Sequence, residues 1–192
     1  TVNRYLTAKK IDFEIIAVDD STDGTWEILK SLEKKYPRLK VAHGWKPPSY
    51  GKALRKGFKL AKGKIVVPFN GDMCDSLDDV MKYMKIINSG YDMAFGSRYI
   101  SGGKSVNYPR IKKIFSVLGN LFLMILFRVR CNDLTQSFKA YRREVVEDVK
   151  PVSNGYEVSF ELALRAIKKG YKFKTIPISW MGRTSGSSKM NL

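Results

Sequence analysis

The sequence predicts an α/β fold with a mainly parallel sheet and helices on both of its faces. Short apolar runs of strand length alternate along the chain with longer segments that have helical spacing. Turn-forming residues separate these segments. Strands that alternate with helices are typical of parallel sheets, because each parallel connection needs a crossover that a helix can supply.

The first three elements illustrate this alternation. Residues 13–18 form a short apolar run, which predicts a strand. After a turn-rich segment at 21–25, apolar residues at 26, 29, 32 and 36 recur at helical spacing, and Pro37 ends that helix. Residues 39–42 form the second predicted strand.

The same order continues to residue 97. Residues 51–62 form a predicted helix with apolar residues on one face and Gly63 as its cap. We expect a buried strand at 65–69, a helix at 77–89 and a strand at 91–97. The second half adds a long, mostly apolar helix at 110–130, a short strand near 137–141, a helix at 155–169 and a last strand at 172–178.

Polar residues gather where three predicted strands end. They are Asp19-Asp20, Asn70-Gly71-Asp72 and Ser97-Arg98. In open α/β sheets, ligands bind beyond the carboxyl ends of the strands. A single strand with polar residues at its end does not indicate a site, because any strand can end in polar residues. Polar residues at the ends of three strands together favour a binding site.

The charge of the chain points to an anionic partner. Lys and Arg number 35 against 18 acidic residues, which gives a net charge of +17. Nucleic acid, an anionic membrane and phosphorylated small molecules all fit this charge. The sequence contains no recognisable nucleic-acid-binding motif, so we expect no nucleic-acid partner.

Cysteine and histidine are scarce. The chain has Cys74, Cys131 and the single histidine His43, and no CxxC pair. This scarcity argues against structural zinc and against the disulfide framework of small secreted domains. This pattern favours a reducing, cytoplasmic-side location.

Asn70-Gly71-Asp72 is the strongest local candidate for a metal site. Mg²⁺ and Mn²⁺ prefer oxygen ligands, and Mg²⁺ is often held by one or two carboxylates together with substrate phosphates. Asp72 offers a carboxylate and Asn70 a neutral amide oxygen. The same tripeptide is also a common turn, and Asp20 by itself could simply be an acid at a helix start.

Two further segments have alternative interpretations. Arg183 and Lys189 flank a Ser- and Gly-rich stretch, which suits a loop that closes on a diphosphate but also a solvated tail. The helix at 110–130 has basic residues at both ends. It suits a helix lying in a membrane interface, although a buried core helix is the alternative.

Several motifs in chain order resemble family 2 glycosyltransferases. They lie at residues 18–25, 51–58, 70–72, 96–99, 133–142, 155–161 and 183–189. Within that family the sequence is most similar to dolichol-phosphate mannose synthases and related polyprenyl-phosphate sugar transferases. The resemblance implies a GT-A fold, a nucleotide sugar donor such as GDP-mannose or UDP-glucose, Mg²⁺ or Mn²⁺, and a polyprenyl phosphate acceptor.

The resemblance also implies roles for individual residues. Val18 and Asp20 would contact the base and ribose, and Glu157 falls near a further contact. The residues around the metal and diphosphate would be Asn70, Gly71, Asp72 and Cys74. Arg98, Arg183 and Lys189 would bind phosphates, and Asp133 is a candidate on the acceptor side.

This chain departs from the family pattern in three places. The first strand of the family is missing, so we expect residues 1–192 to be a single catalytic domain truncated at its N-terminus, and Asn191-Leu192 is also unlike a natural end. Asn70 replaces the first carboxylate of the metal motif. Cys74 stands where glutamine is frequent, and a thiol is a poor Mg²⁺ ligand; Asp75 lies next to it.

The predicted function is transfer of mannose or glucose from a nucleotide sugar to polyprenyl phosphate, with inversion, at the cytoplasmic face of a membrane. The protein would be peripheral or anchored through segments outside this chain. A transferase that extends a glycan and an inactive, membrane-bound homologue remain alternatives, the latter because of Asn70.

Overall fold

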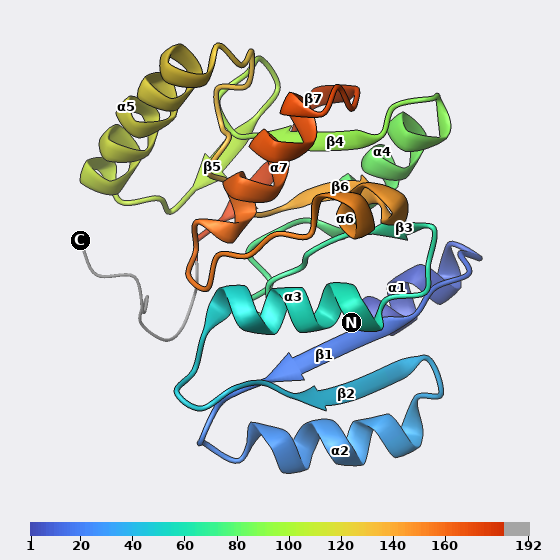
Figure 1. The fold of residues 1–192 in the computed structure, drawn as a ribbon. Coiled ribbons are helices and arrows are strands. Elements are labelled where there is room, and N and C mark those ends of the chain that lie inside the picture. Colours follow the sequence, from blue (N-terminus) through green and yellow to red (C-terminus); the bar gives the residue numbers. More distant parts are fainter. Residues whose placement is uncertain (183–192) are drawn as a thin grey trace. The chain divides into compact units, whose positions relative to one another are not determined.

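The computed structural model describes residues 1–182, which belong to two compact units. The first unit contains residues 1–66 and 141–171. The second contains residues 67–140 and the segment that begins at Lys172. Figure 1 shows the elements of both, and each unit is described by itself.

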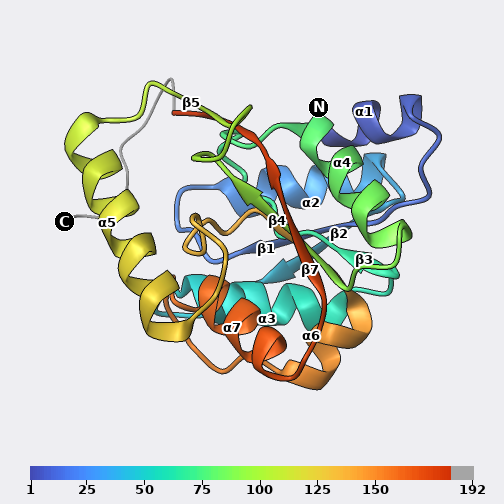
Figure 2. The same ribbon diagram turned by 90° about the horizontal axis from the view of Figure 1, so that it is seen from above.

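The first unit is built around a parallel pair of strands. Its elements are α1 (Val2–Ala8), β1 (Ile15–Asp19), α2 (Thr25–Lys35), β2 (Leu39–His43), α3 (Tyr50–Leu60), β3 (Ile65–Val66), α6 (Arg143–Val149) and α7 (Val158–Lys168). β1 and β2 pair in register from Ile15 opposite Leu39 to Asp19 opposite His43. Figures 1 and 2 show α2 and α3 on opposite sides of this pair.

Local chemistry explains where these helices begin. Ser49 caps α3, because its hydroxyl accepts a hydrogen bond from the Lys52 amide. α2 follows Gly24, whose φ of 80° is in the left-handed region that glycine adopts readily. The residue before it, Asp23, accepts hydrogen bonds from both the amide and the hydroxyl of Thr25. These turn residues set the direction in which each helix leaves its strand.

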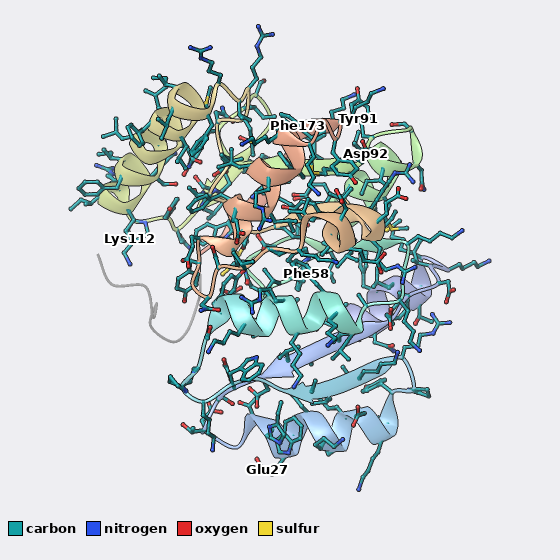
Figure 3. All side chains as sticks on the ribbon, viewed as in Figure 1. Glu27, Phe58, Tyr91, Asp92, Lys112 and Phe173 are labelled. Carbon is teal, nitrogen blue, oxygen red and sulfur yellow. The ribbon has the colours of Figure 1, made fainter. Side chains whose placement is uncertain are left out.

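The second unit contains the most deeply buried strand. Its elements are α4 (Leu77–Asn88), β4 (Met93–Ser97), β5 (Lys104–Val106), α5 (Arg110–Phe127), β7 (Phe173–Pro177) and β8 (Ser179–Met181). Every residue of β4 is buried, and β4 runs parallel to β7. Phe95 of β4 stacks on Phe173 of β7, which is labelled in Figure 3, with ring centroids 4.8 Å apart. β5 and β8 form a further parallel pair.

One strand passes from the second unit into the first. β6 (Lys139–Arg142) begins in the second unit beside β4. Its last residues, Tyr141 and Arg142, pair antiparallel with Val66 and Ile65 in the first unit. The sheet is therefore mixed at this point, although the β1–β2, β4–β7 and β5–β8 pairs are parallel.

The expected strands and helices through residue 97 are present, with shifts at their ends. The strand expected at 65–69 is reduced to β3, because Pro68 has no amide hydrogen with which to extend the pairing. The helix expected to reach residue 130 ends at Phe127, where Arg128 adopts the left-handed conformation with φ of 53°. The short elements α1, β5, α6 and β8 were not predicted.

Candidate active site

The loop that follows β3 carries Asn70 and Asp72 in the second unit. The Asn70 amide nitrogen donates to the Ser137 hydroxyl at 3.1 Å, which leaves its oxygen as the atom that can serve as a ligand. One Asp72 carboxylate oxygen accepts from the Cys74 amide at 3.2 Å. Gly71 lies exposed between them, and a Cβ there would meet nothing within 4 Å.

Strand β8 holds residues 70–75, which we call the acidic loop, in place. The Met181 amide donates to the Cys74 carbonyl at 2.9 Å, and Trp180 forms an isolated β-bridge with Asp75. The Ser179 amide donates to the Asp79 carboxylate at 2.8 Å. Because β8 lies about 100 residues along the chain, its contribution could not be read from the local sequence.

Asp75 is an unusual member of this loop. The residue is 4% exposed, and among residues 1–182 neither carboxylate oxygen has a hydrogen-bond partner. Burial raises the pKa of Asp75 to about 7, and the nearby charge of Asp72 adds to the rise, while Arg98 and the Asn70 side chain oppose it. The sequence placed Asp75 beside Cys74 but did not show whether it compensates for Asn70 and Cys74, because burial of a single acid leaves no sequence signal.

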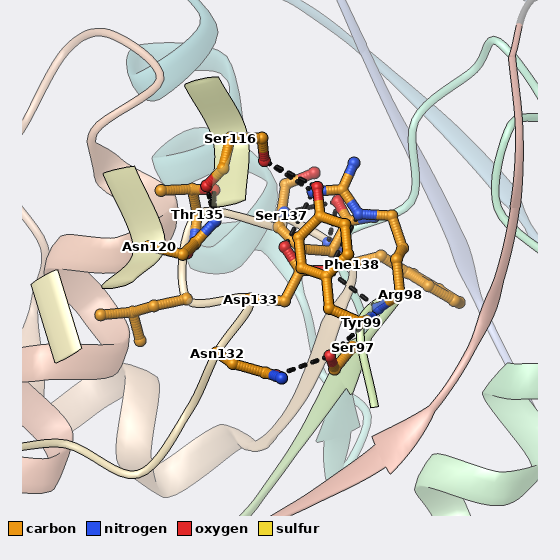
Figure 4. A network of polar contacts seen from close by, with 12 residues as sticks. Ser97, Arg98, Tyr99, Ser116, Asn120, Asn132, Asp133, Thr135, Ser137 and Phe138 are labelled. Carbon is orange, nitrogen blue, oxygen red and sulfur yellow. Dashed lines mark hydrogen bonds and ion pairs between the residues drawn. The ribbon is translucent and has the colours of Figure 1, made fainter. Parts of the chain in front are cut away.

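Arg98 forms a buried ion pair with Asp133, as Figure 4 shows. The guanidinium donates through two nitrogens to the two carboxylate oxygens, each at 2.8 Å, and the Arg98 amide donates to the same carboxylate at 2.9 Å. The side chains are 7% and 0% exposed. Burial alone would lower the pKa of Arg98, but the hydrogen bonds and charge of Asp133 raise it, so the guanidinium stays cationic.

Aromatic rings surround the Arg98 guanidinium. Its central carbon lies 5.0, 5.2 and 5.9 Å from the ring centroids of Tyr99, Tyr108 and Trp180. Trp180 thus touches both Arg98, through its ring, and Asp75, through its backbone. This shared neighbour joins the acidic loop to the end of β4.

A polar contact attaches helix α5 to the same region. The Asn120 side chain is fully buried and bonds the amide and hydroxyl of Thr135 at 2.9 Å each. It is the only buried residue of α5, and Figure 4 shows its link to the segment that carries Asp133. None of the helices within residues 1–182 is both long and apolar enough to cross a bilayer.

The donor groups suit a hard divalent cation. Asp72 supplies a carboxylate, Asn70 an amide oxygen, and the unpartnered carboxylate of Asp75 lies within electrostatic reach of Asp72. Cys74 is buried, and its thiol lies 3.9 Å from the Asp72 carbonyl oxygen. Across the described part of the chain, no three His, Cys, Asp or Glu side chains form a complete metal site by themselves.

Val18 and Asp20 lie in the first unit, at the end of β1. One Asp20 oxygen accepts from the Ser49 amide at 2.8 Å. Gly44 packs so closely against Asp20 that a Cβ on it would lie 2.4 Å from the Asp20 Cβ. Val18 faces α3 in a similar way, with its methyl 3.7 Å from where a Gly57 Cβ would be. This strand end is therefore held closely by β2 and α3.

The segment before α7 is tied to α3 within the same unit. The Asn154 carbonyl accepts from the Ser49 hydroxyl and the Gly51 amide, both at 2.7 Å. Arg55 donates to the Asn154 side chain at 3.1 Å. Glu157 accepts from the Gly155 amide at 2.9 Å. Asn154, which sequence reasoning did not single out, is the residue that links these contacts.

The predicted site residues fall into two groups. The first unit contains Val18, Asp20 and Glu157. The second contains Asn70, Gly71, Asp72, Cys74, Arg98 and Asp133, and there the segment 133–137 bonds both Arg98 and Asn70. Arg183 and Lys189 lie outside the described residues.

Comparison with known proteins agrees with the expected fold and family. The chain is 33% identical over 185 residues to the dolichol-phosphate mannosyltransferase of Pyrococcus furiosus, covering 94% of this chain but 51% of that protein. It is 34% identical over 185 residues to the polyprenol monophosphomannose synthase of Mycolicibacterium smegmatis, covering 92% of this chain and 70% of that protein. The chain thus spans about half the length of the first relative.

Solved structures support the GT-A fold. A structure of glucosyl-3-phosphoglycerate synthase from Mycobacterium tuberculosis with Mn²⁺, UDP-glucose and phosphoglyceric acid has a TM-score of 0.65 at 15% identity, covering 95% of this chain and 68% of that one. The same synthase with Mg²⁺ and UDP has a TM-score of 0.60 at 14% identity, covering 98% and 76%. Residues 1–150 match the family described as glycosyl transferase family 2. This chain therefore belongs to glycosyl transferase family 2.

Proposed function

We propose that this chain is the catalytic part of a metal-dependent, inverting transferase that moves mannose or glucose from a nucleoside diphosphate sugar to dolichyl or polyprenyl phosphate. The observation that carries the proposal is its 33% and 34% identity, over nearly the whole chain, to two enzymes named for that type of acceptor. The net charge of +17 suits a donor and an acceptor that are both anionic.

The reaction suits a site with few general bases. An oxygen of the acceptor phosphate attacks the anomeric carbon, and the carbon–oxygen bond to the diphosphate breaks, so the electron pair leaves with the nucleoside diphosphate. The attacking oxygen is already anionic and needs no residue to remove a proton. The chain's single histidine, His43, is stacked on Trp26 in the first unit.

The residues of the acidic loop would hold the divalent cation. Asp72 would bind Mg²⁺ or Mn²⁺ through its carboxylate, and Asn70 through its amide oxygen. When bound, the cation would neutralise the negative charge that develops on the leaving diphosphate. β8 keeps this loop in position through its bonds to Cys74 and Asp79.

Arg98 would contact a phosphate, and Asp133 would position it. Two guanidinium nitrogens are engaged by Asp133, so the third, Nη1, is the donor that can reach a phosphate oxygen. The rings of Tyr99, Tyr108 and Trp180 limit the directions in which the guanidinium can turn. Asp133 thus acts through Arg98 rather than on the acceptor directly.

In the first unit, Val18 and Asp20 would contact the base and ribose of the donor, and Glu157 would lie near them. The Ser49 amide already orients the Asp20 carboxylate. A ribose hydroxyl could donate to the same group, since a carboxylate accepts several hydrogen bonds.

Helix α5 would rest on the membrane that contains the acceptor lipid. Ten of its apolar side chains are exposed by 40% or more: Ile111, Ile114, Phe115, Val117, Leu118, Leu121, Phe122, Ile125, Leu126 and Phe127. Basic residues lie near both ends, including Lys112, which Figure 3 labels, and Arg128. An exposed apolar helix with basic flanks suits the interface of an anionic membrane.

Sugar transfer by the purified full-length protein tests the catalytic proposal. With Mn²⁺ and GDP-mannose or UDP-glucose, we expect transfer to polyprenyl phosphate but not to an oligosaccharide. Asp72→Ala should abolish transfer, whereas Asp78→Asn, an exposed acid on the same segment, should retain it. Undiminished transfer by Asp72→Ala would reject the metal role, and a preference for the oligosaccharide would reject the lipid acceptor.

Co-sedimentation with vesicles tests the membrane proposal. Phe122→Asp with Ile125→Asp should reduce binding to vesicles that contain anionic lipid about tenfold or more, because both side chains are more than 60% exposed on α5. Ile28→Asp, equally exposed on α2 in the other unit, serves as the matched control. Equal binding by all three proteins would show that α5 does not contact the membrane.

A further inference from the structure

Two neighbouring acids, Asp75 in the acidic loop and Asp79 in the first turn of α4, are both buried but differ in their partners. Asp79 is 1% exposed, and its carboxylate accepts from the Ser179 amide and forms an ion pair with Lys82. Asp75 is 4% exposed, and among the described residues no donor meets either of its oxygens with hydrogen-bond geometry. A buried carboxylate in this region can therefore have hydrogen-bond and ion-pair partners, as Asp79 does, whereas Asp75 has none with hydrogen-bond geometry within residues 1–182.

An unpartnered buried carboxylate is costly to keep. Leaving such a group without a hydrogen bond costs free energy that folding does not recover, so its presence calls for an explanation. Asp75 lies three positions after Asp72 in the chain, and the charges of the two side chains interact. Two carboxylates that repel one another across a short loop would both be stabilised by a divalent cation between them.

Backbone contacts with β8 fix the position of Asp75 in the loop that carries Asp72. Its bridge with Trp180 ties it to β8, and the neighbouring Cys74 carbonyl accepts from the Met181 amide at 2.9 Å. Asp75 is therefore held by backbone contacts on the same segment as Asp72. In the described part of the chain, neither of its carboxylate oxygens meets a donor with hydrogen-bond geometry, although the Asn70 side chain lies close enough to lower its pKa.

We propose that Asp75 is a carboxylate ligand of the divalent cation and supplies the negative charge that Asn70 lacks. This inference rests on the proposed function, since it assigns a residue to the cation of that site. Asn70 and Asp72 alone would offer one negative charge, whereas Asp72 and Asp75 together offer two. Hard cations such as Mg²⁺ and Mn²⁺ bind more tightly as the number of carboxylate ligands rises.

Titration of the full-length protein with Mn²⁺, followed by the electron paramagnetic resonance signal of the free ion, tests this directly. The titration is made with Mn²⁺ alone and with GDP or UDP added. We expect Asp75→Asn to weaken Mn²⁺ binding at least tenfold, and Asn70→Asp to restore part of the loss when it is added to that variant. Asp78→Asn, which removes a charge three residues away, should stay within twofold of the unaltered chain.

A second measurement does not depend on how well the Asp75 variant folds. In a chain with Trp26→Phe and Trp45→Phe, Trp180 is the remaining tryptophan among the three in the sequence. Because Trp180 is bridged to Asp75, bound Mn²⁺ should quench its fluorescence, while the diamagnetic Mg²⁺ should compete and reverse the quenching. Saturation with Mn²⁺ without any change in this fluorescence would overturn the proposal.

The outcomes separate this inference from the proposed function. Mn²⁺ affinity that is unchanged within twofold in Asp75→Asn would overturn the ligand role, even if sugar transfer is intact. Conversely, the protein could bind Mn²⁺ in a way that depends on Asp75 and yet transfer no sugar. That result would support the ligand role and contradict the proposed transferase activity. A chain that binds no Mn²⁺ at all, with or without the nucleotide, would reject both.

Discussion

The carboxylates of the first unit and those of the acidic loop in the second unit differ in how their charge is satisfied. Asp20 accepts from the Ser49 amide, and Glu161 accepts from the amides of Val152 and Ser153. Asp75 is more deeply buried than either and accepts none within the described residues. These acids of the first unit thus hold its loops together, whereas the second unit contains one buried acid whose oxygens accept no hydrogen bond within the described residues.

The Arg98–Asp133 pair shares one property with each of these groups of acids. It belongs to the second unit, but its charges satisfy each other fully through three hydrogen bonds to Asp133. The same unit therefore contains a carboxylate that is completely paired and one that has no partner. This contrast teaches that burial alone does not identify a functional acid, and that the absence of a partner is the more informative observation. Three substitutions test it, from the largest expected effect to the smallest.

Removal of the Asp133 charge should have the largest effect. Asp133→Asn leaves the Arg98 guanidinium buried without a counter-charge, so we expect a loss of about 3–5 kcal/mol in the free energy of unfolding. Urea denaturation measures this loss. Replacement of both partners by apolar residues, Arg98→Met with Asp133→Leu, should cost less than the single change. A larger loss in the double variant would contradict this account of the pair.

Glu161 should have an intermediate, pH-dependent effect. Burial tends to raise its pKa, but hydrogen bonds from Ser153, Val152 and Arg165 outweigh this and lower the pKa to about 2. A depressed folded-state pKa stabilises the protein above the unfolded value of 4.5, and this stabilisation is lost as the pH falls through about 2. We expect Glu161→Gln to cost about 1–2 kcal/mol at pH 7, and the difference to shrink below about pH 4.

Denaturation of both proteins at several pH values measures this dependence. Glu157, which accepts a single amide hydrogen bond at the end of the same loop, is the matched control. Glu157→Gln should cost less than Glu161→Gln at neutral pH. A Glu161→Gln effect that is constant from pH 7 to pH 3 would show that the charge of Glu161 is not what holds the loop.

Of the three substitutions, Asp75→Asn should change the free energy of unfolding least, and it should raise the stability rather than lower it. In buffer without divalent cations, at a pH above the Asp75 pKa of about 7, Asp75→Asn removes a buried charge that has no hydrogen-bond partner among residues 1–182, so we expect the free energy of unfolding to rise by about 1 kcal/mol. Asp78→Asn should instead lower it by about 0.5 kcal/mol, because Asp78 lies in the first turn of α4, where a negative charge is favourable. A loss of stability in Asp75→Asn would mean that this carboxylate has a structural role.

Helices α5 and α7 show where sequence reasoning reached its limit. Both have apolar residues at helical spacing, and a buried core helix was an open alternative for α5. Five of the 11 residues of α7 are buried, against one of the 18 of α5. Periodicity identifies a helix and its apolar residues, but it does not say whether another part of the protein covers them.

The site was predicted only in part, because a sequence pattern does not show which distant segments make contact. Asn70, Asp72 and Arg98 could be found because they follow predicted strands, where ligands of α/β proteins bind. Trp180 and Asn154 were missed because their roles depend on contacts with distant segments. The short strand β8 has three residues and too little pattern to be recognised before its pairing with β5 is known.

The sequence by itself determined the order of the helices and strands, the positions of the loops that carry polar residues, and the excess of positive charge. These depend on neighbouring residues, whose spacing and turn chemistry act locally. Only the tertiary structure decided that Asp133 pairs with Arg98, that β8 fastens the acidic loop, and that Asp75 is buried without a partner. Those features depend on segments between 35 and about 100 residues apart, and no local pattern encodes which side chains meet after folding.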